Sequence, residues 1–470
     1  MPTVSLTRKR FLLVMAVLVL VEVLSSFEHV MMIAAFPLIG EEFGFSAAGW
    51  TMTAFLLVQG STAAIGARLG DIWGHARIIP ILLVLSVSGS LLSALSHSIE
   101  LLIVGRGLQG LSGAILPLAY AIAKQTAPSK ELPFWIGTLT GGVTISAAGG
   151  FVLGGYISDL GDWRMIFWFT FFYGLICIAL FLAFVPRFPG VSTDKRIDWL
   201  GATLLPAGLA TTLYATGTAF GSGSIEPPTL FLGAIGALLL GWWWRAEWFH
   251  PQPLIQVRLL TERPILIGNL SFAIAGLGVM QFPIVMMQYL QQPVASGVGL
   301  GLSATVAGLL KLPSNVASLF AAMFAGWMCG RIGGHRVIQL GALLCAAAWF
   351  SMIFIRDTPW QVMTTAVFAA SGGATLLASI PNLVLKFSPA DRAGEATGLA
   401  MVTMRLASAV GAQVVAMLMA MSVMPSPNGR SYPTEAGYIG IFCAVAISGL
   451  LIALIASSIS HYRPADDQAV

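Results

Sequence analysis

The feature that most constrains this chain is a series of long apolar stretches that recurs along nearly its whole length. An α-helix rises about 1.5 Å per residue, so about 18 to 20 apolar residues cross the roughly 30 Å hydrocarbon core of a bilayer. Fourteen stretches reach that length, and their apolar residues are continuous instead of alternating, which favours helices over a β-barrel. With 57% hydrophobic and 9% charged residues, the chain cannot present an ordinary polar surface to water. The sequence therefore predicts an all-α polytopic membrane protein.

The first expected span follows the basic residues Arg8, Lys9 and Arg10 and continues to about Pro37. It lacks a small-residue cleavage site, so we expect a retained span and not a signal peptide. The other expected spans lie near residues 48–69, 78–96, 99–124, 134–158, 163–186, 199–220, 228–246, 264–291, 300–328, 337–355, 360–386, 396–424 and 436–459. Residues 246–263 have a mixed, partly amphipathic pattern that is typical of a connector on the membrane surface.

Basic residues fix the expected orientation. If the N-terminus is cytoplasmic, eighteen of the 24 Lys and Arg residues face the cytoplasm, and only Arg164, Arg356 and Arg430 lie in outer loops. This asymmetry agrees with the positive-inside rule and requires an even number of spans. We therefore expect an integral protein of the cytoplasmic (inner or plasma) membrane with both termini in the cytoplasm. The overall charge of +4 reflects this topology and does not indicate nucleic-acid binding.

A short charged loop, residues 66–77, has a second copy at residues 326–336. Both copies have glycine at the first, fifth and ninth places, followed by histidine: Gly66, Gly70, Gly74 and His75, then Gly326, Gly330, Gly334 and His335. Two copies in register predict a duplicated architecture. We expect a six-span bundle in residues 1–190, two additional spans and a connector in 191–263, and a second six-span bundle with a short tail in 264–470.

Six ionisable residues are expected inside the membrane, where a charge costs at least about 2.5 to 3.5 kcal/mol. They are Glu22, Glu28 and His29 in the first span, Arg106 in the fourth, Lys311 in the tenth and Arg405 in the thirteenth. Each therefore needs a partner, a wet cavity or a function. The four cysteines have no paired spacing, so neither a disulfide framework nor a metal site is expected.

The acids of the first span are candidates for proton coupling, because a carboxyl group in a low-dielectric cavity exchanges protons closer to neutral pH. Glu22 and His29 are seven residues apart and share a helical face, whereas Glu28 is turned by roughly 100° from His29. We expect both acids to meet one cavity. The alternative interpretations are a structural ion pair for each acid and an ordinary hydrogen-bonded side chain for His29.

The intramembrane cations have two interpretations each. Arg106 is expected to pair with an acid of the first span, for coupling or for structure. Lys311, two residues before Pro313, suits an anionic substrate group or a first-span acid; Arg405 suits the same roles or reaches towards the cytoplasmic boundary. Polar lining of a substrate cavity is predicted for Gln59, Gln109, Asn269 and Gln281, with helix-to-helix hydrogen bonds as the alternative.

The loop at residues 66–77 resembles the signature between the second and third spans of the major facilitator superfamily. The matching positions include Gly66, Gly70, Asp71, Gly74 and Arg77, and Arg68 belongs to the same gating loop. In that family the loop locks the cytoplasmic ends of the two halves, with its aspartate against a helix of the other half. The resemblance implies the thirteenth span and Arg392 as that partner.

Further motifs resemble the fourteen-span drug:proton antiporter branch, of the quaternary-ammonium-resistance type. Arg106, Gln109 and Gly110 match a fourth-span motif linked to proton transfer, and the segment from Glu28 to Pro37 is similar to the branch's first-span motif, with Glu for the usual Asp. Gly150, Gly154 and Gly155 match the antiporter motif of the fifth span. That motif is imperfect, because Ser146 replaces a glycine and Phe151 replaces a proline.

The resemblance implies two pseudo-symmetric six-helix bundles plus two extra spans. It also implies proton-coupled export of amphiphilic organic compounds by alternating access. We expect a monomer without a cofactor. Proton-driven uptake of an organic anion and lipid flipping are the alternatives. No zinc-binding, nucleotide-binding or serine-nucleophile motif is present, so the sequence argues against an enzyme.

Overall fold

A computed structural model of the chain describes residues 7–128, 131–187, 198–222, 226–250, 253, 257–387, 393–425 and 431–458. Nearly all of these residues are helical, as the continuous apolar stretches predicted. The first helical bundle contains α1 (Arg8–Phe43), α2 (Phe45–Trp73), α3 (His75–Ala94), α4 (Ile99–Gly110), the 3₁₀ segment η1 (Leu111–Ala114), α5 (Ile115–Thr126), α6 (Leu132–Asp159) and α7 (Arg164–Phe184).

The remaining elements form a helical pair and a second bundle. The pair is α8 (Trp199–Ser222) and α9 (Pro227–Phe249), and the short segment η2 (Val257–Thr261) follows it. The second bundle contains α10 (Arg263–Leu277), η3 (Val279–Gln281), α11 (Phe282–Gln291), η4 (Val294–Ser296), α12 (Ala304–Ile332), α13 (Gly334–Ser351), α14 (Pro359–Phe387), α15 (Ala393–Met421) and α16 (Glu435–Ser457). Between α15 and α16, the strands β1 (Val423–Pro425) and β2 (Ser431–Pro433) pair antiparallel, which the sequence did not predict.

Helical segments coincide with all fourteen expected apolar stretches. Two of the stretches are interrupted by a 3₁₀ turn, at η1 and at η3. Ten segments among the described residues are long and apolar enough, by length and composition, to cross a membrane. The fold is therefore that of a polytopic helical membrane protein.

Residues 66–77 are largely helical, so the prediction that they form a loop is wrong. Helix α2 continues through it to Trp73, and the turn is confined to Gly74, whose φ of 99° favours glycine. Gly66 and Gly70 face the adjacent span inside the bundle, where their missing Cβ atoms give room to Ala114 and Leu118. These glycines serve helix packing, as small residues do in membrane bundles.

The second copy of this motif repeats the turn with a shift of one residue. Helix α12 ends at Ile332, and the residue with a positive φ, 89°, is Gly333. Its equivalent in the first copy is Gly74, although the sequence register had placed Gly74 opposite Gly334. The duplication is therefore visible in the structure as well as in the sequence. Relative to the sequence alignment of the two copies, the turn of the second copy comes one residue earlier.

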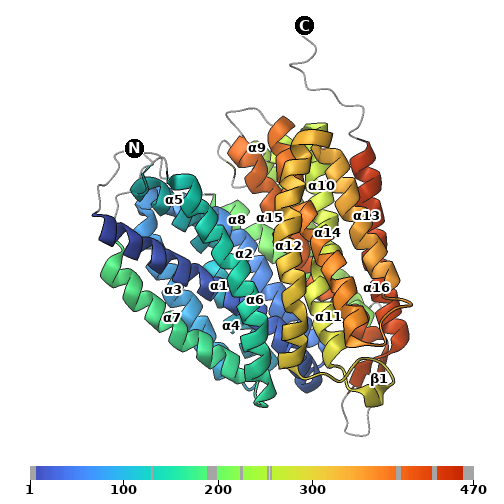
Figure 1. The fold of residues 1–470 in the computed structure, drawn as a ribbon. Helices are drawn as coiled ribbons and strands as arrows, with labels where there is room; N and C mark the ends of the chain where they lie inside the picture. Colours follow the sequence, from blue (N-terminus) through green and yellow to red (C-terminus); the bar gives the residue numbers. More distant parts are fainter. Residues whose placement is uncertain are drawn as a thin grey trace.

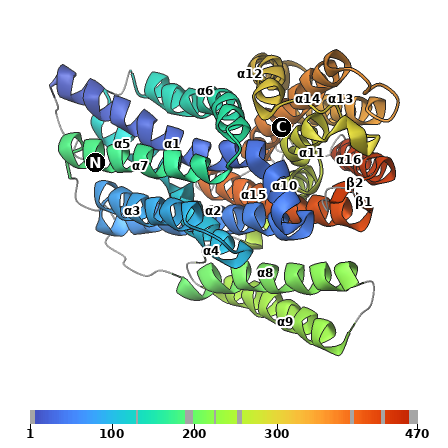
Figure 2. The same cartoon turned by 90° about the horizontal axis from the view of Figure 1, so that it is seen from below.

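The two bundles lie side by side, and their helices diverge towards the end of the molecule where α1 begins and α16 ends (Figure 1). We call this end the terminal face, and the opposite end, where α1 and α6 end and the β1–β2 pair lies, the closed face. Helices α8 and α9 form a separate pair that lies against α2 and α15 (Figure 2).

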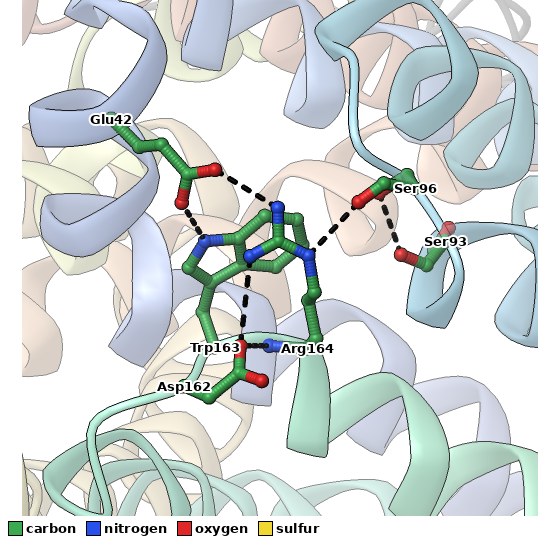
Figure 3. Close-up of polar contacts among 6 residues, drawn as sticks. All are labelled: Glu42, Ser93, Ser96, Asp162, Trp163 and Arg164. Carbon is green, nitrogen blue, oxygen red and sulfur yellow. Dashed lines mark hydrogen bonds and ion pairs between the residues drawn. The ribbon is translucent and has the colours of Figure 1, made fainter.

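At the closed face of the first bundle, Arg164 joins three helices (Figure 3). Its Nη2 donates to Glu42 Oε1 at 2.9 Å and its Nε to the Ser96 carbonyl at 2.9 Å, while the neighbouring Trp163 indole donates to Glu42 Oε2 at 2.6 Å. These contacts fix the ends of α1, α3 and α7. Asp162 completes the cluster by accepting from the Arg164 backbone N–H at 2.9 Å.

The second bundle has a comparable cluster with the charges arranged differently. Arg356, after α13, forms an ion pair with Glu435 at the start of α16, and its backbone carbonyl accepts from the Tyr289 hydroxyl of α11 at 3.2 Å. The Tyr438 ring of α16 packs edge-to-face on Tyr289, with centroids 5.2 Å apart. Each bundle is thus tied at the closed face by one arginine.

Candidate functional site

A cavity of about 300 Å³ lies between the two bundles. Its walls come from α1, α2, η1, α5 and α6 on one side and from η3, α11, α14 and α15 on the other. The polar and ionisable side chains in its lining are Glu22, Ser25, Ser26, His29, Gln59, Gln281, Arg405 and Ser408. The rest of the lining is mostly aliphatic, which suits a small amphiphilic molecule.

Glu22 and Arg405 bring opposite charges to this cavity from different bundles. Arg405 Nη1 donates to Gln59 Oε1, a hydrogen bond that joins α15 to α2 across the cavity. The side chain therefore turns into the protein, and the alternative in which it reaches the cytoplasmic boundary is wrong. Glu22 is 6% exposed, and its Oε2 atom is buried without a hydrogen-bond partner among the described residues. A carboxylate oxygen is thus left open to a ligand or a proton.

Glu28 does not line this cavity, so the prediction that both acids meet there is wrong. Its carboxylate points into the first bundle, where Oε1 accepts from the Ser86 hydroxyl at 2.5 Å and from the Ser90 hydroxyl at 3.4 Å. The physical reason is the turn of roughly 100° per residue, which directs Glu28 to α3 while its neighbour His29 faces the cavity.

Arg106 lies beside Glu28 but does not form the predicted ion pair with it. Nη1 donates to the backbone carbonyl of Glu28 at 2.7 Å and to Gln109 Oε1 at 2.5 Å, and Nε donates to the Thr51 carbonyl at 3.3 Å. Gln109 in turn donates to the Ser90 hydroxyl at 2.7 Å. Gln109 and Ser90 therefore link the Arg106 guanidinium to the Glu28 carboxylate in series, and the two charged groups do not contact each other directly.

Phe55 contacts both His29 and Arg106, a relationship that the sequence did not reveal. The His29 ring stacks on Phe55 with centroids 5.5 Å apart, and Arg106 Cζ lies 4.3 Å from the Phe55 centroid. The aromatic ring thus contacts a cavity-lining imidazole and the buried guanidinium. A cation over an aromatic face is stabilised by about 2 kcal/mol when desolvated.

Lys311 is buried at 3% exposure and does not line the cavity. Its Nζ lies 4.6 Å from the ring centroid of Phe151 on α6 and 4.4 Å from that of Phe282 on α11. No described acid lies within ion-pair distance, so the predicted pairing with a first-span acid is wrong. Phe151, which replaces the proline of the antiporter motif, supplies one of the two aromatic faces.

The predicted polar lining divides into two groups. Gln59 and Gln281 line the cavity, and Gln281 Nε2 also donates to the carbonyls of Gly276 and Ser408. Gln109 belongs to the Arg106 network. Asn269 accepts from the Thr403 hydroxyl at 3.0 Å and so joins α10 to α15 as a helix-to-helix contact.

The described glycines of the loop at residues 66–77 pack or turn within the first bundle. Gly66 faces η1, Gly70 faces α5 and Gly74 forms the turn, while Arg68 is half-buried and Arg77 is exposed. The side chain of Asp71 and the whole of Arg392 lie outside the described residues. Their predicted pairing across the halves therefore stays a prediction.

A second contact between the halves occurs at the closed face, where α6 meets α12. A Cβ atom on Gly154 would lie 2.8 Å from Met31 Cα, and one on Gly155 would collide with the Ala304 carbonyl. Gly150 faces Val30 of α1 at 3.2 Å in the same way. The three glycines of the antiporter motif thus allow α6 to approach α1 and α12 closely.

Asp159, the last residue of α6, strengthens this contact. Its Oδ1 accepts from the backbone N–H of Ala304 at 2.7 Å and its Oδ2 from that of Thr305 at 2.8 Å. A carboxylate of one half therefore caps the N-terminus of α12 in the other half, where the helix dipole favours negative charge. Asp159 was not among the residues predicted from the sequence, although an acid at the end of one span is a recognisable signal for such a cap.

The paired helices α2 and α15 also meet towards the closed face. Thr53 Oγ1 donates to the Ala409 carbonyl and to Gln413 Oε1, each at 3.2 Å, and Gln413 Nε2 donates to the Ser46 carbonyl at 3.3 Å. With the α6–α12 contact, these bonds join the halves on the side of the cavity opposite the terminal face.

Comparisons with known proteins agree with this architecture. The family model described as Major Facilitator Superfamily matches residues 18–412 and 277–469. A multidrug resistance protein B homolog of Mycobacterium tuberculosis is 28% identical over 317 residues, which are 65% of this chain and 56% of that protein. The methyl viologen resistance protein SmvA of Salmonella typhimurium is 26% identical over 385 residues, or 80% and 76% of the two chains.

The fold matches a solved transporter as well. The crystal structure of peptide transporter POT in complex with sulfate superimposes with a TM-score of 0.69 and 15% identity, and the match covers 95% of this chain and 94% of that one. At this identity the likeness concerns the fold alone. In sequence, the chain spans about half the length of the first curated relatives that it matches.

Proposed function

Because the chain belongs to the major facilitator superfamily, we propose that it is a proton-coupled secondary transporter that exports amphiphilic organic compounds by alternating access. The names of the relatives support export, since one is a multidrug resistance protein B homolog and another a methyl viologen resistance protein. Sequence identities of 28% and 26% do not by themselves assign either activity to this chain. The cavity between the halves supports the proposal more directly.

We further propose that all fourteen helical segments cross the membrane and that both termini are cytoplasmic. Ten segments satisfy the length and composition requirement by themselves. The other four, α2, α6, α8 and α13, coincide with expected apolar stretches, and α2 and α6 hold positions at the cavity. In this orientation the terminal face is cytoplasmic, so the structure corresponds to an inward-facing state of a monomer.

The single observation that carries the proposal is the Glu22 carboxylate in the cavity. One of its oxygens is buried without a partner among the described residues, while the nearby Arg405 is hydrogen-bonded to Gln59. A cationic substrate group and a proton can compete for the same oxygen. Such competition is the simplest physical basis for exchanging one for the other.

Glu28 is the second proton site in this proposal. It lies closer to the closed face and is enclosed by Ser86, Ser90 and the Arg106 network, so substrate does not contact it directly. Protonation from outside neutralises Glu28 and weakens its hold on the serine hydroxyls of α3. We propose that this change favours the inward-facing state, in which the proton is released to the cytoplasm.

Purified protein in liposomes with an imposed pH gradient tests the function, with ethidium as the amphiphilic probe. We expect gradient-driven ethidium accumulation by the unaltered protein, its loss in Glu22→Gln and Glu28→Gln, and normal transport in Glu226→Gln, a variant of an exposed acid between α8 and α9. Ethidium binding should persist in Glu28→Gln and weaken in Glu22→Gln. Transport indifferent to every ion gradient would contradict the proposal.

Uptake of an organic anion with protons is the alternative, and Arg405 in the cavity lining favours it. The two functions predict opposite directions of substrate movement under the same pH gradient. An amphiphilic carboxylate that accumulates with the proton, in liposomes that leave ethidium unmoved, would establish uptake.

A further inference from the structure

We propose that a second cavity, at the closed face, is a binding site for a free aromatic organic cation. We call it the closed-face pocket. Its volume is about 580 Å³, and its walls come from the end of α1, the start of α2, one stretch of α8, and the end of α15 with β1. It shares no described lining residue with the central cavity, so the inference concerns a ligand site outside the transport cavity.

The turn between α1 and α2 forms one side of the closed-face pocket. Gly44, with a φ of 87°, lies between the last residue of α1 and the first residue of α2. A Cβ atom on Gly44 would meet nothing within 4 Å, so the space beside the turn is open. Phe45 packs instead on Gly40, where an added Cβ atom would collide with the Phe45 ring. This glycine turn thus leaves a hollow where the two helices meet.

Helix α8 closes the opposite side of the hollow. It contacts both α2 and α15, and a Cβ atom on Gly217 would lie 3.4 Å from Met417 Sδ of α15. Gly217 and Tyr214, about one helical turn apart, both line the pocket. The walls therefore belong to the two bundles and to the α8–α9 pair. Without α8, the start of α2 and the end of α15 would form an open surface instead of a pocket.

Aromatic rings in the wall suit a ligand with an aromatic body. Trp50 of α2 and Tyr214 of α8 line the pocket with their ring centroids 6.2 Å apart, and Phe43 adds a third ring. The faces of tryptophan and tyrosine rings attract a cation that lies within about 6 Å of the ring centroid. Tyr214 is 53% exposed, so packing within the protein leaves much of its ring available to a ligand.

Glu41 determines the sign of the charge that the closed-face pocket favours. Its carboxylate lines the pocket, and the described lining includes no lysine, arginine or histidine. In the central cavity, by contrast, Arg405 accompanies Glu22. A cavity lined by one sign of charge concentrates ligands of the opposite sign. Aromatic rings beside a carboxylate therefore favour an aromatic cation.

A lipid headgroup fits this lining less well than a free cation does. Choline carries a quaternary ammonium group, but in a phospholipid a phosphate lies close to it. That phosphate would bring a second negative charge beside Glu41, where no basic residue of the described lining could pair with it. Ethidium is an aromatic cation without a phosphate, so it serves as the probe.

Equilibrium dialysis of ethidium against the full chain in a nonionic detergent tests the site without transport. We expect the unaltered protein to bind ethidium both in the central cavity and in the closed-face pocket. Glu41→Gln and Tyr214→Leu should weaken binding in the closed-face pocket at least about tenfold and leave the central cavity unchanged. Glu22→Gln should do the reverse. The double variant Glu22→Gln/Glu41→Gln should lose both sites.

Matched variants control for unspecific effects. Tyr156→Leu removes a tyrosine of α6 that is 56% exposed and does not line the pocket, and Glu226→Gln removes an exposed acid between α8 and α9. Both variants should keep both sites. Melting without ethidium shows which variants fold, and the isosteric Glu41→Gln decides if Tyr214→Leu does not.

Three results would overturn the inference. The first is that Glu41→Gln leaves ethidium binding unchanged. The second is that Glu22→Gln alone abolishes all binding. The third is that soluble glycerophosphocholine displaces ethidium from the Glu22→Gln variant, which would assign the pocket to a lipid headgroup. Because dialysis needs no pH gradient, failure of gradient-driven transport would contradict the proposed function and leave this site in place.

Discussion

The Arg106 guanidinium donates to the backbone carbonyl of Glu28 at 2.7 Å and leaves the carboxylate of that residue to serine hydroxyls. The arginine thereby fixes the position of α1 without neutralising its acid. This geometry allows the charge of Glu28 to change during transport while the helix stays in place.

Arg106→Lys tests this positioning role. One ammonium cannot reach Glu28, Gln109 and Thr51 as the planar guanidinium does, and each lost hydrogen bond to a charged group costs about 1.5 to 3 kcal/mol. We expect a clearly lower melting temperature in detergent and a large loss of ethidium transport. A lysine variant with unaltered melting and transport would show that the charge alone suffices.

Gly155→Ala tests the close approach of α6 to α12. The added methyl group would collide with the backbone carbonyl of Ala304, so the halves must separate at the closed face. We expect faster labelling of a cysteine introduced at Val152 by an impermeant thiol reagent, and weaker transport. Gly149→Ala is the matched control on the same helix, because a Cβ there meets nothing within 4 Å. Equal behaviour of the two variants would refute the packing argument.

Asp159→Ala removes the cap that one half places on α12 of the other. Loss of an N-cap costs about 0.5 to 2 kcal/mol, which corresponds to a shift of roughly 2- to 30-fold towards the outward-open state. Labelling of the Val152→Cys variant from outside should rise accordingly. Asp162→Ala is the control, since Asp162 contacts Arg164 within the first bundle. A larger effect of the control would assign the gate to the Arg164 cluster instead.

Lys311→Met addresses the buried lysine between Phe151 and Phe282. Its cation has aromatic contacts but no described acid, and an unpaired buried charge destabilises a folded protein. We expect methionine to raise the free energy of unfolding by about 1 kcal/mol or more. Transport then reports the role of the charge: a stable but inactive variant shows that the cycle needs the cation. A less stable variant would show that the aromatic contacts outweigh the cost of burial.

The fold was predictable from the sequence because its driving pattern is local. Continuous apolar stretches fix the helices, and the repeated glycine motif revealed the duplication. Details set by neighbours were not predictable: α2 continues through Gly66 and Gly70 because Ala114 and Leu118 fill the space beside them. The turn at Gly333 instead of Gly334 depends on where α12 ends, which no periodicity specifies.

The site was only partly predictable for a similar reason. The rule that charges inside a membrane need a partner or a function singled out Glu22, Glu28, Arg106 and Arg405. Helical geometry, however, gives only the angle between two side chains on one helix and not the neighbouring helix that each side chain faces. Glu28 was therefore placed in the cavity that Glu22 occupies. Asp159 was missed because its partners, the N–H groups of Ala304 and Thr305, lie about 145 residues away in the chain.

The position of α8 has a consequence for how the proposed amphiphilic substrates reach the cavity. Amphiphilic molecules dissolve in the bilayer, so they can enter a transporter from the lipid as well as from water. Helix α8 contacts both α2 and α15, with the Tyr214 ring 6.2 Å from that of Trp50, and so covers the seam between those helices. On α12, by contrast, Phe320 and Met323 are 64% and 66% exposed and available to acyl chains. The α8–α9 pair therefore makes the two lipid-facing sides of the molecule unequal. It blocks entry of amphiphilic molecules from the bilayer on the side of α2 and α15.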